Sequence, residues 1–203
     1  LYDHCKITAA IAGCMLAYLN EQNLRNYREI LFQKGSETYE RKAFLLMSLD
    51  ISGIQSFLYT VGSDNVLKTL RAKSFYLEIM LEHIVDELLE QVGLSRANLI
   101  YSGGGHAYLL LANTEKTQEL IKNFKAELNH WFLKWFKTDL YMAVGLAECS
   151  ANDLMNQPRG SYEAIFKAAG KSISASKANR YTMSELLALN RRKAGQYERE
   201  CKV

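Results

Sequence analysis

Proline is almost absent from this sequence, and it has neither long apolar runs nor a strong charge of either sign. Pro158 is the only proline among 203 residues, and no Gly/Ser tract provides a flexible linker. The longest apolar runs fall far short of the ~20 residues that a membrane-spanning helix needs, so we expect no contact with a membrane. The 25 Lys and Arg residues against 22 Asp and Glu give a net charge of +3, too weak to indicate nucleic-acid binding by itself.

Cysteine is sparse and gives no sign of a disulfide framework. Cys5, Cys14, Cys149 and Cys201 show no pairing pattern, and no signal peptide precedes them. These features predict a reducing, cytoplasmic location.

Hydrophobic residues make up 48% of the chain, which allows a sizeable core. Because the chain begins at Leu1 instead of Met, we expect it to be a piece of a larger polypeptide.

The order of apolar patterns predicts an α+β fold. The nearly continuous apolar run 43–49 is typical of a strand buried on both faces. An amphipathic helix over 66–92 ends at Gly93, and a second helix spans 114–137. Strands are predicted at 98–101, 107–111 and 140–147, and further helices at 161–170 and 183–192. The order βαββαβ is the split βαβ, ferredoxin-like arrangement.

The stretch Ser102-Gly103-Gly104-Gly105-His106 joins two of these strands. Nucleotide cyclases and polymerase palms turn a hairpin at the active site with an apolar–Gly-Gly–x–x–apolar pattern, in which the two residues after Gly-Gly are acidic and hold a divalent metal. Here those residues are Gly105 and His106. Three successive glycines exceed what a hairpin requires, so close approach of a base or ribose is predicted, with Ser102 available to a base edge. Metal-dependent chemistry by this copy is not expected.

Asp50 ends the first predicted strand, where palm carboxylates meet across adjacent strands. It could share Mg²⁺ with the hairpin region, or it could cap the helix expected near Gly53. The segment Ile51-Ser52-Gly53 lies at this strand-to-helix junction. Backbone N–H groups there could bind a triphosphate, or the segment could be an ordinary turn.

Three further features have both a functional and a structural interpretation. Lys177 and Arg180 follow the last core strand and could neutralise β- and γ-phosphates, or they could form a solvated basic surface. Asp3 and His4 could belong to a binuclear phosphohydrolase metal site, or they could cap a helix. Cys201 could be the first ligand of a zinc module.

Together these motifs resemble the large subunit of type III CRISPR–Cas effector complexes, most closely its Csm (III-A) branch. The resemblance rests on four stretches that occur in the same order and cover nearly the whole chain. They are 1–4 with 8–12 (LYDH and TAAIA), 50–57 (DISGIQSF), 71–76 (RAKSFY) and 102–106 (SGGGH).

Members of that family have an HD nuclease domain that cuts single-stranded DNA, two palms with a zinc module between them, and a helical C-terminal domain. Their second palm carries Gly-Gly-Asp-Asp and converts ATP into cyclic oligoadenylates when target RNA is bound, whereas the first palm helps to hold ATP. The resemblance therefore implies that residues 1–34 are the end of the HD domain, 40–190 the first palm and 191–203 the start of the zinc module.

The same resemblance implies the site and its partners. ATP would contact Asp50, Ile51, Ser52, Gly53, Ser102, Gly103, Gly104 and Gly105, with Lys177 and Arg180 as further candidates. Mg²⁺ or Mn²⁺ would act in the full subunit, with Asp50 and Asp3 as candidate ligands, and Zn²⁺ would bind at Cys201. Partners would be the rest of the subunit, other Csm subunits, and guide and target RNA. The alternative is a non-catalytic scaffold that packs against partner subunits and binds no nucleotide.

Overall fold

The computed structural model describes residues 1–60 and 65–190. Its centre is a four-stranded antiparallel sheet in the order β2-β3-β1-β4. Helix α4 (Val66–Val92) connects the first two strands along the chain, and α5 (Glu115–Phe136) connects the last two. This βαββαβ topology confirms the predicted ferredoxin-like α+β fold. The strands are β1 (Phe44–Ser52), β2 (Leu99–Gly103), β3 (His106–Ala112) and β4 (Tyr141–Cys149).

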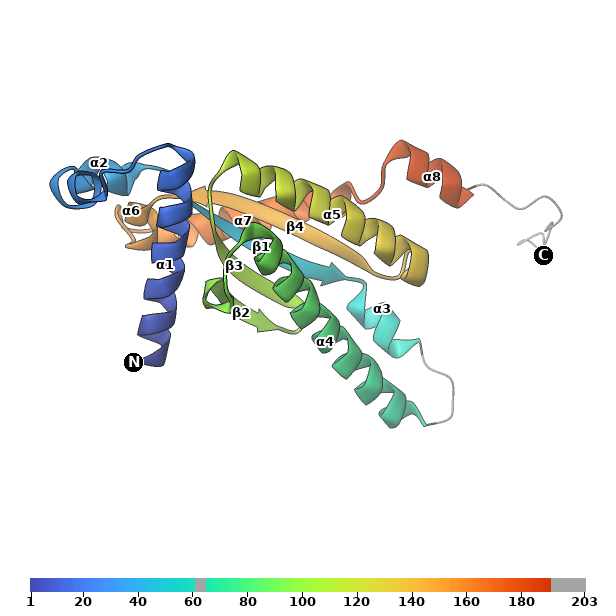
Figure 1. Cartoon of the computed structure of the whole chain (residues 1–203). Coiled ribbons are helices and arrows are strands. Elements are labelled where there is room, and N and C mark those ends of the chain that lie inside the picture. The colour runs from blue at the N-terminus through green and yellow to red at the C-terminus, as the bar shows by residue number, and fades with distance from the viewer. Residues whose placement is uncertain (61–64, 191–203) are drawn as a thin grey trace, which may run out of the picture.

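Helices cover both faces of β1, and all nine of its residues are buried, as the continuous apolar run predicts. Successive side chains of a strand point to opposite faces. Leu45, Met47, Leu49 and Ile51 share one apolar core with α4 and α5, which lie in front of the sheet in Figure 1. Phe44 and Leu46 belong to a second core with α1 (Tyr2–Glu21) and α7 (Ser161–Ala178) on the other face.

Glycines set two features of this packing. The φ of +72° at Gly93 ends α4 in the left-handed region, as predicted. Helix α7 continues past the expected end at Gly170 as far as Ala178, because it packs closely on β4. A Cβ at Gly145 of β4 would lie 2.4 Å from the Ala169 carbonyl oxygen, so this residue has room only for hydrogen.

The free edge of β4 is closed by side chains of the neighbouring helices. The Asn129 side chain accepts from the Met142 N–H at 2.9 Å and donates to the Met142 carbonyl at 3.0 Å. Ser176 and Ser172 of α7 accept from the N–H groups of Val144 and Leu146. These bonds satisfy backbone groups that would otherwise invite another strand to pair.

The remaining elements are short. They are η1 (Glu29–Gln33), α2 (Gly35–Glu40), α3 (Ile54–Tyr59), η2 (Arg96–Asn98), α6 (Ala151–Leu154) and α8 (Met183–Asn190).

None of the helices in the described part of the chain combines the length and apolar character that a bilayer crossing needs.

Candidate functional site

Asp50 lies within β1, directly opposite His106 of β3, and is only 5% exposed. Its Oδ2 is 2.9 Å from His106 Nδ1, and its Oδ1 is 2.9 Å from Lys177 Nζ of α7. Ser52 Oγ donates to Asp50 Oδ1 at 3.3 Å. The structure thus brings together three predicted site residues (Asp50, Ser52 and Lys177) and His106, in what we call the Asp50 cluster.

The alternative interpretation of Asp50 as a helix cap is wrong. Gly53 is the N-cap residue of α3, and no side chain caps this helix. Gly53 has a φ of +95°, and a Cβ there would lie 1.8 Å from the Asp139 carbonyl oxygen. Packing against the chain before β4 therefore explains this glycine.

The geometry does not fit a divalent metal at Asp50. Both carboxylate oxygens already face nitrogen donors of His106 and Lys177, and Mg²⁺ requires several oxygen ligands. Among residues 1–60 and 65–190, no group of three His, Cys, Asp or Glu residues could hold a metal ion. In this palm the positive charge beside the carboxylate comes from protein side chains, and we derive no metal-dependent step here.

The glycine hairpin turns through two left-handed residues, Gly104 at φ +61° and Gly105 at φ +83°, the geometry of a tight two-residue turn. A Cβ at Gly105 would lie 2.1 Å from Ile54 Cδ1, and the Gly105 carbonyl accepts from the Ile51 N–H at 2.9 Å. The left-handed turn therefore accounts for Gly105, since the Cδ1 end of Ile54 could shift for an added Cβ. A Cβ at Gly104 would meet nothing within 4 Å, so its backbone is open to a ligand.

Ser102 is held by a residue that the sequence analysis did not identify. Its Oγ donates to Glu82 Oε1 of α4 at 2.7 Å. Arg96 forms an ion pair with Glu82 and lies 2.9 Å from Asp86. Hydrogen bonds from Arg96 and then Ser102 lower the pKa of the Glu82 carboxyl. No spacing in the sequence links α4 to β2 in this way, so only the fold reveals this contact.

The other predicted residues lie apart from the Asp50 cluster. Arg180 stacks over the ring of Tyr141 at 5.6 Å and donates to the Lys177 carbonyl; among the described residues it has no bond to Asp50. Asp3 and His4 are exposed in the first turn of α1, whose N-cap is Leu1. Residues 191–203, with Cys201, lie outside the described residues.

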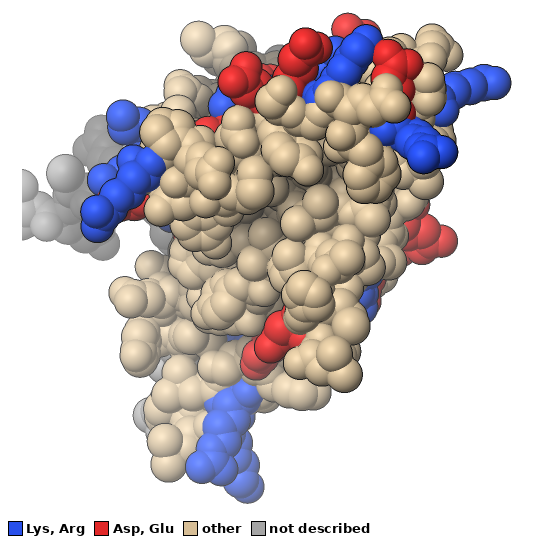
Figure 2. All heavy atoms as spheres, turned by 90° about the vertical axis from the view of Figure 1, so that its left-hand side faces the viewer, with Lys and Arg blue, Asp and Glu red and all other residues tan. Residues whose placement is uncertain are grey.

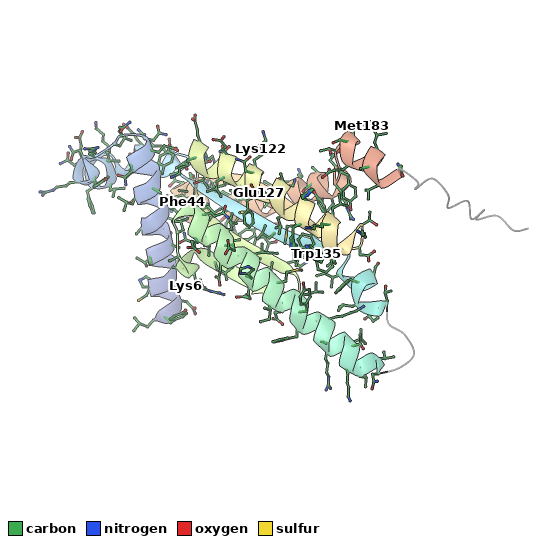
Figure 3. All side chains as sticks on the ribbon, turned by 45° about the vertical axis from the view of Figure 1, so that its right-hand side comes forward. Lys6, Phe44, Lys122, Glu127, Trp135 and Met183 are labelled. Carbon is green, nitrogen blue, oxygen red and sulfur yellow. The ribbon has the colours of Figure 1, made fainter. Side chains whose placement is uncertain are left out.

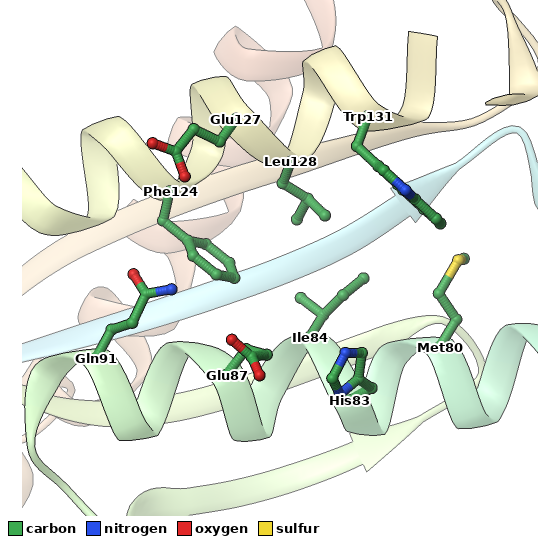
Figure 4. A pocket seen from close by; sticks show the side chains of 9 residues that line it. All are labelled: Met80, His83, Ile84, Glu87, Gln91, Phe124, Glu127, Leu128 and Trp131. Carbon is green, nitrogen blue, oxygen red and sulfur yellow. The ribbon is translucent and has the colours of Figure 1, made fainter. Parts of the chain in front are cut away.

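A cleft between α4 and α5 has a volume of about 370 Å³, but its chemistry does not suit a nucleotide. It opens on the face of the sheet opposite Asp50, and most of its lining is apolar (Figure 4). Its two carboxylates would repel phosphate groups, and its lining includes no Lys or Arg. The lining residues are Met80, His83, Ile84, Glu87, Gln91, Phe124, Glu127, Leu128 and Trp131.

An antiparallel βαββαβ sheet with a two-glycine hairpin beside an acid-bearing strand defines a palm-type domain of the nucleotide-cyclase and polymerase class. The family model described as "Csm1 subunit domain B" matches residues 43–192. The chain therefore belongs to the Csm1 family, the Cas10-type large subunits of type III-A CRISPR systems.

The similar curated proteins are named CRISPR system single-strand-specific deoxyribonuclease Cas10/Csm1. The chain is 48% identical to that of Enterococcus italicus over 94% of its length. It is 45% identical to that of Mycobacterium tuberculosis over its whole length. It spans only about a quarter of these relatives, 25% and 27% of their lengths.

Solved structures with the same fold include Csm1–Csm4 cassettes. The match to the cassette in complex with pppApA has 30% identity and a TM-score of 0.77. It covers 88% of this chain and 24% of the matched chain. The match to the cassette in complex with one ATP has 30% identity and a TM-score of 0.74. It covers 88% of this chain and 23% of the matched chain. A third cassette, with a TM-score of 0.74, is in complex with cA4.

Proposed function

We propose that this chain is the first palm of a type III-A large subunit and that it helps to hold ATP without performing the catalytic step. The observation that carries the proposal is that the fold matches cassettes in complex with ATP, pppApA and cA4 over most of the chain. The open backbone at Gly104 supports a nucleotide at the hairpin. Because Gly105 and His106 replace the acid pair of an active palm, the chemical step belongs to another part of the protein.

Within this proposal, the Asp50 cluster and the hairpin bind and position the nucleotide. Lys177 lies 2.9 Å from Asp50 Oδ1 and is partly exposed, so its ammonium group can also attract a nearby phosphate. Ser102 is oriented by Glu82 and offers its hydroxyl oxygen as an acceptor. Ile51 and Gly105, joined backbone to backbone, hold the hairpin against the end of β1.

The proposal extends to the whole protein. The whole protein would join ATP into cyclic oligoadenylates when target RNA is bound, and it would cut single-stranded DNA with an HD domain. Mg²⁺ or Mn²⁺ would act outside the described residues, and Zn²⁺ would bind in the linker module. The names of the relatives support the proposed deoxyribonuclease activity, and the cassette in complex with cA4 supports a cyclic oligoadenylate as the product. Csm4 and other Csm subunits, guide RNA and target RNA are the proposed partners, in the cytoplasm.

The division into domains is part of the same proposal. Residues 1–34 would end the HD domain, 40–190 would form the palm, and 191–203 with Cys201 would begin the zinc module.

Helix α1 presents exposed apolar side chains, which suits packing against another part of the larger protein. On the side of the molecule where α1, α2 and α6 lie, charges gather at the upper margin and few lie over the centre (Figure 2). The exposed large apolar residues of α1 are Tyr2, Ile7, Ile11 and Leu16.

The sharpest test is Gly104→Asn in the full-length subunit within its complex. Asn tolerates the left-handed conformation, and the position has free space, so the variant adds a side chain at the proposed ligand surface with little strain. We expect the yield of cyclic oligoadenylate to fall at least about tenfold, the effect of roughly 1.4 kcal/mol of lost binding.

Gly93→Asn is the matched control. Gly93 has a similar φ of +72° and nothing within 4 Å of its would-be Cβ, but it lies at the end of α4, away from the hairpin tip. This variant should keep the wild-type yield. Equal yields in wild type and Gly104→Asn would contradict nucleotide binding at the hairpin and favour the scaffold alternative.

A further inference from the structure

A hollow of about 260 Å³ lies where α5 meets the connection between α7 and α8, beside the β4 edge. Three cationic side chains line it: Lys122 and Lys125 from α5, and Arg180 from the connection. Figure 3 shows Lys122 on the side of α5 away from α4, the side on which α8 begins at Met183. The other lining residues are Ala126, Asn129, Tyr141, Asn179, Tyr181, Thr182 and Glu185. We call this the basic hollow.

The cations of the basic hollow have no carboxylate partner within residues 1–60 and 65–190. Lys125 Nζ donates to Ser176 Oγ at 2.9 Å, which leaves two of its protons free. Arg180 uses only Nε, toward the Lys177 carbonyl, so in the described part of the chain both terminal guanidinium nitrogens have no hydrogen-bond partner. Three like charges in one hollow repel one another, and an anion between them would offset that repulsion.

The acidic lining residue does not supply that anion. Glu185 Oε2 accepts from the Thr182 N–H at 2.7 Å and from Thr182 Oγ1 at 2.8 Å. This carboxylate therefore serves the start of α8, and the three cations outnumber it.

Tyr181 lines the basic hollow, but its hydroxyl oxygen is not one of the donors open to a ligand. Its Oη is buried, and it is the one buried side-chain nitrogen or oxygen without a hydrogen bond among the described residues. Buried polar atoms nearly always have a partner. Desolvation is the main cause that raises the pKa of this hydroxyl, so it stays protonated. The ammonium and guanidinium donors around one hollow match the acceptor oxygens of a phosphate.

We propose that the basic hollow binds a phosphate group, which belongs either to a free polyphosphate or to a nucleic-acid strand that passes along the β4 edge. Its volume is below the 300–1,000 Å³ typical of pockets for whole small ligands, so it suits a phosphate and its neighbouring atoms rather than a complete nucleotide. This assigns Arg180 to the hollow instead of the Asp50 cluster. The site is separate from the glycine hairpin and does not depend on the proposed function.

Hydrogen–deuterium exchange of the full-length protein tests this proposal, with inorganic triphosphate and single-stranded oligothymidylate as separate probes. We expect a probe to protect the peptides that contain 122–129 and 179–186. Protection by triphosphate alone supports a free polyphosphate, and protection by the oligonucleotide alone supports a strand; protection by both supports the shared phosphate chemistry. No protection by either probe overturns the proposal, whatever ATP does at the hairpin.

Two variants and a control decide whether these residues cause the protection. Lys122→Gln should raise the probe concentration for half protection about tenfold. Arg180→Gln should weaken binding too, because it removes a guanidinium whose terminal nitrogens have no hydrogen-bond partner among the described residues. Lys134→Gln makes the same charge change on α5 outside the hollow, beside Trp135, and should behave as wild type. Equal binding by all variants would overturn the proposal.

Discussion

The two faces of β1 differ, although one continuous apolar run builds most of both. Toward α4 and α5, every side chain from Leu45 to Ile51 that faces this core is apolar. Toward α1 and α7 the strand begins with Phe44 and Leu46 but ends with Ser48, Asp50 and Ser52, which are all buried. The first face holds the fold together. The second changes within one strand from core to charged cluster, and that is where the candidate site lies.

The largest expected effect comes from breaking the first face. Leu49 is 0% exposed, and Leu49→Ala should lower the free energy of unfolding by about 2–5 kcal/mol, because it loses buried area and leaves a cavity. The urea dependence of hydrogen exchange in the β1 peptide of the full-length protein measures this change. Leu67→Ala is the control, since Leu67 is 73% exposed, and should change stability by no more than about 0.5 kcal/mol.

A substitution on the second face should lower the free energy of unfolding by less. Asp50→Asn keeps the shape of the side chain but leaves Lys177 and His106 without a carboxylate. Both partners are partly exposed, Lys177 at 37% and His106 at 53% of their side chains, and can turn toward water. We expect a loss of about 1.5–3 kcal/mol, the value of hydrogen bonds to a charged group, measured by the same exchange experiment.

Added Mg²⁺ sharpens this prediction. If protein side chains alone satisfy the Asp50 carboxylate, Mg²⁺ should not change exchange in β1 of either the wild type or Asp50→Asn. Protection of β1 by Mg²⁺ in the wild type that disappears in Asp50→Asn would instead make Asp50 a metal ligand.

The smallest effect concerns the apolar end of the second face, where Cys14 and Cys149 are buried. Desolvation raises the pKa of each thiol from 9.0 to about 12. Both stay protonated and unreactive below that pH in the folded protein, while the unfolded chain loses these protons near pH 9. Their contribution to stability is therefore fully present below pH 9 and is lost as the pH rises toward 12.

Site-resolved alkylation at pH 8 measures this difference. The exposed Cys5 should be labelled in the native protein, whereas Cys14 and Cys149 should be labelled only after denaturation. Fast native labelling of Cys14 would mean that the core under α1 is open.

Local patterns in the sequence were sufficient to predict the fold. The apolar run that becomes β1 and the stop of α4 at Gly93 are encoded by neighbouring residues, so the βαββαβ order follows from periodicity. The bounds were less accurate: β1 extends through Ser52, and α7 continues to Ala178 because Gly145 allows close packing.

The site depends on contacts between distant segments, and a single sequence does not encode these as spacings. Lys177 was a candidate phosphate ligand, but its ion pair with Asp50 appears only when α7 packs on β1. The glycines show the same limit. Gly53 is explained by the Asp139 carbonyl, which lies outside its motif, and Gly105 by its left-handed turn; of these three glycines only Gly104 keeps an open surface.

Photo-crosslinking with azido-ATP tests the central claim most directly, namely that this palm holds a nucleotide at its glycine hairpin. The full-length subunit would be irradiated with the probe and digested, and the labelled peptides would be identified by mass spectrometry. We predict label in the peptide that contains residues 102–106, with loss of that label when excess ATP competes. Label confined to peptides outside this chain would contradict the claim and leave the domain as a scaffold.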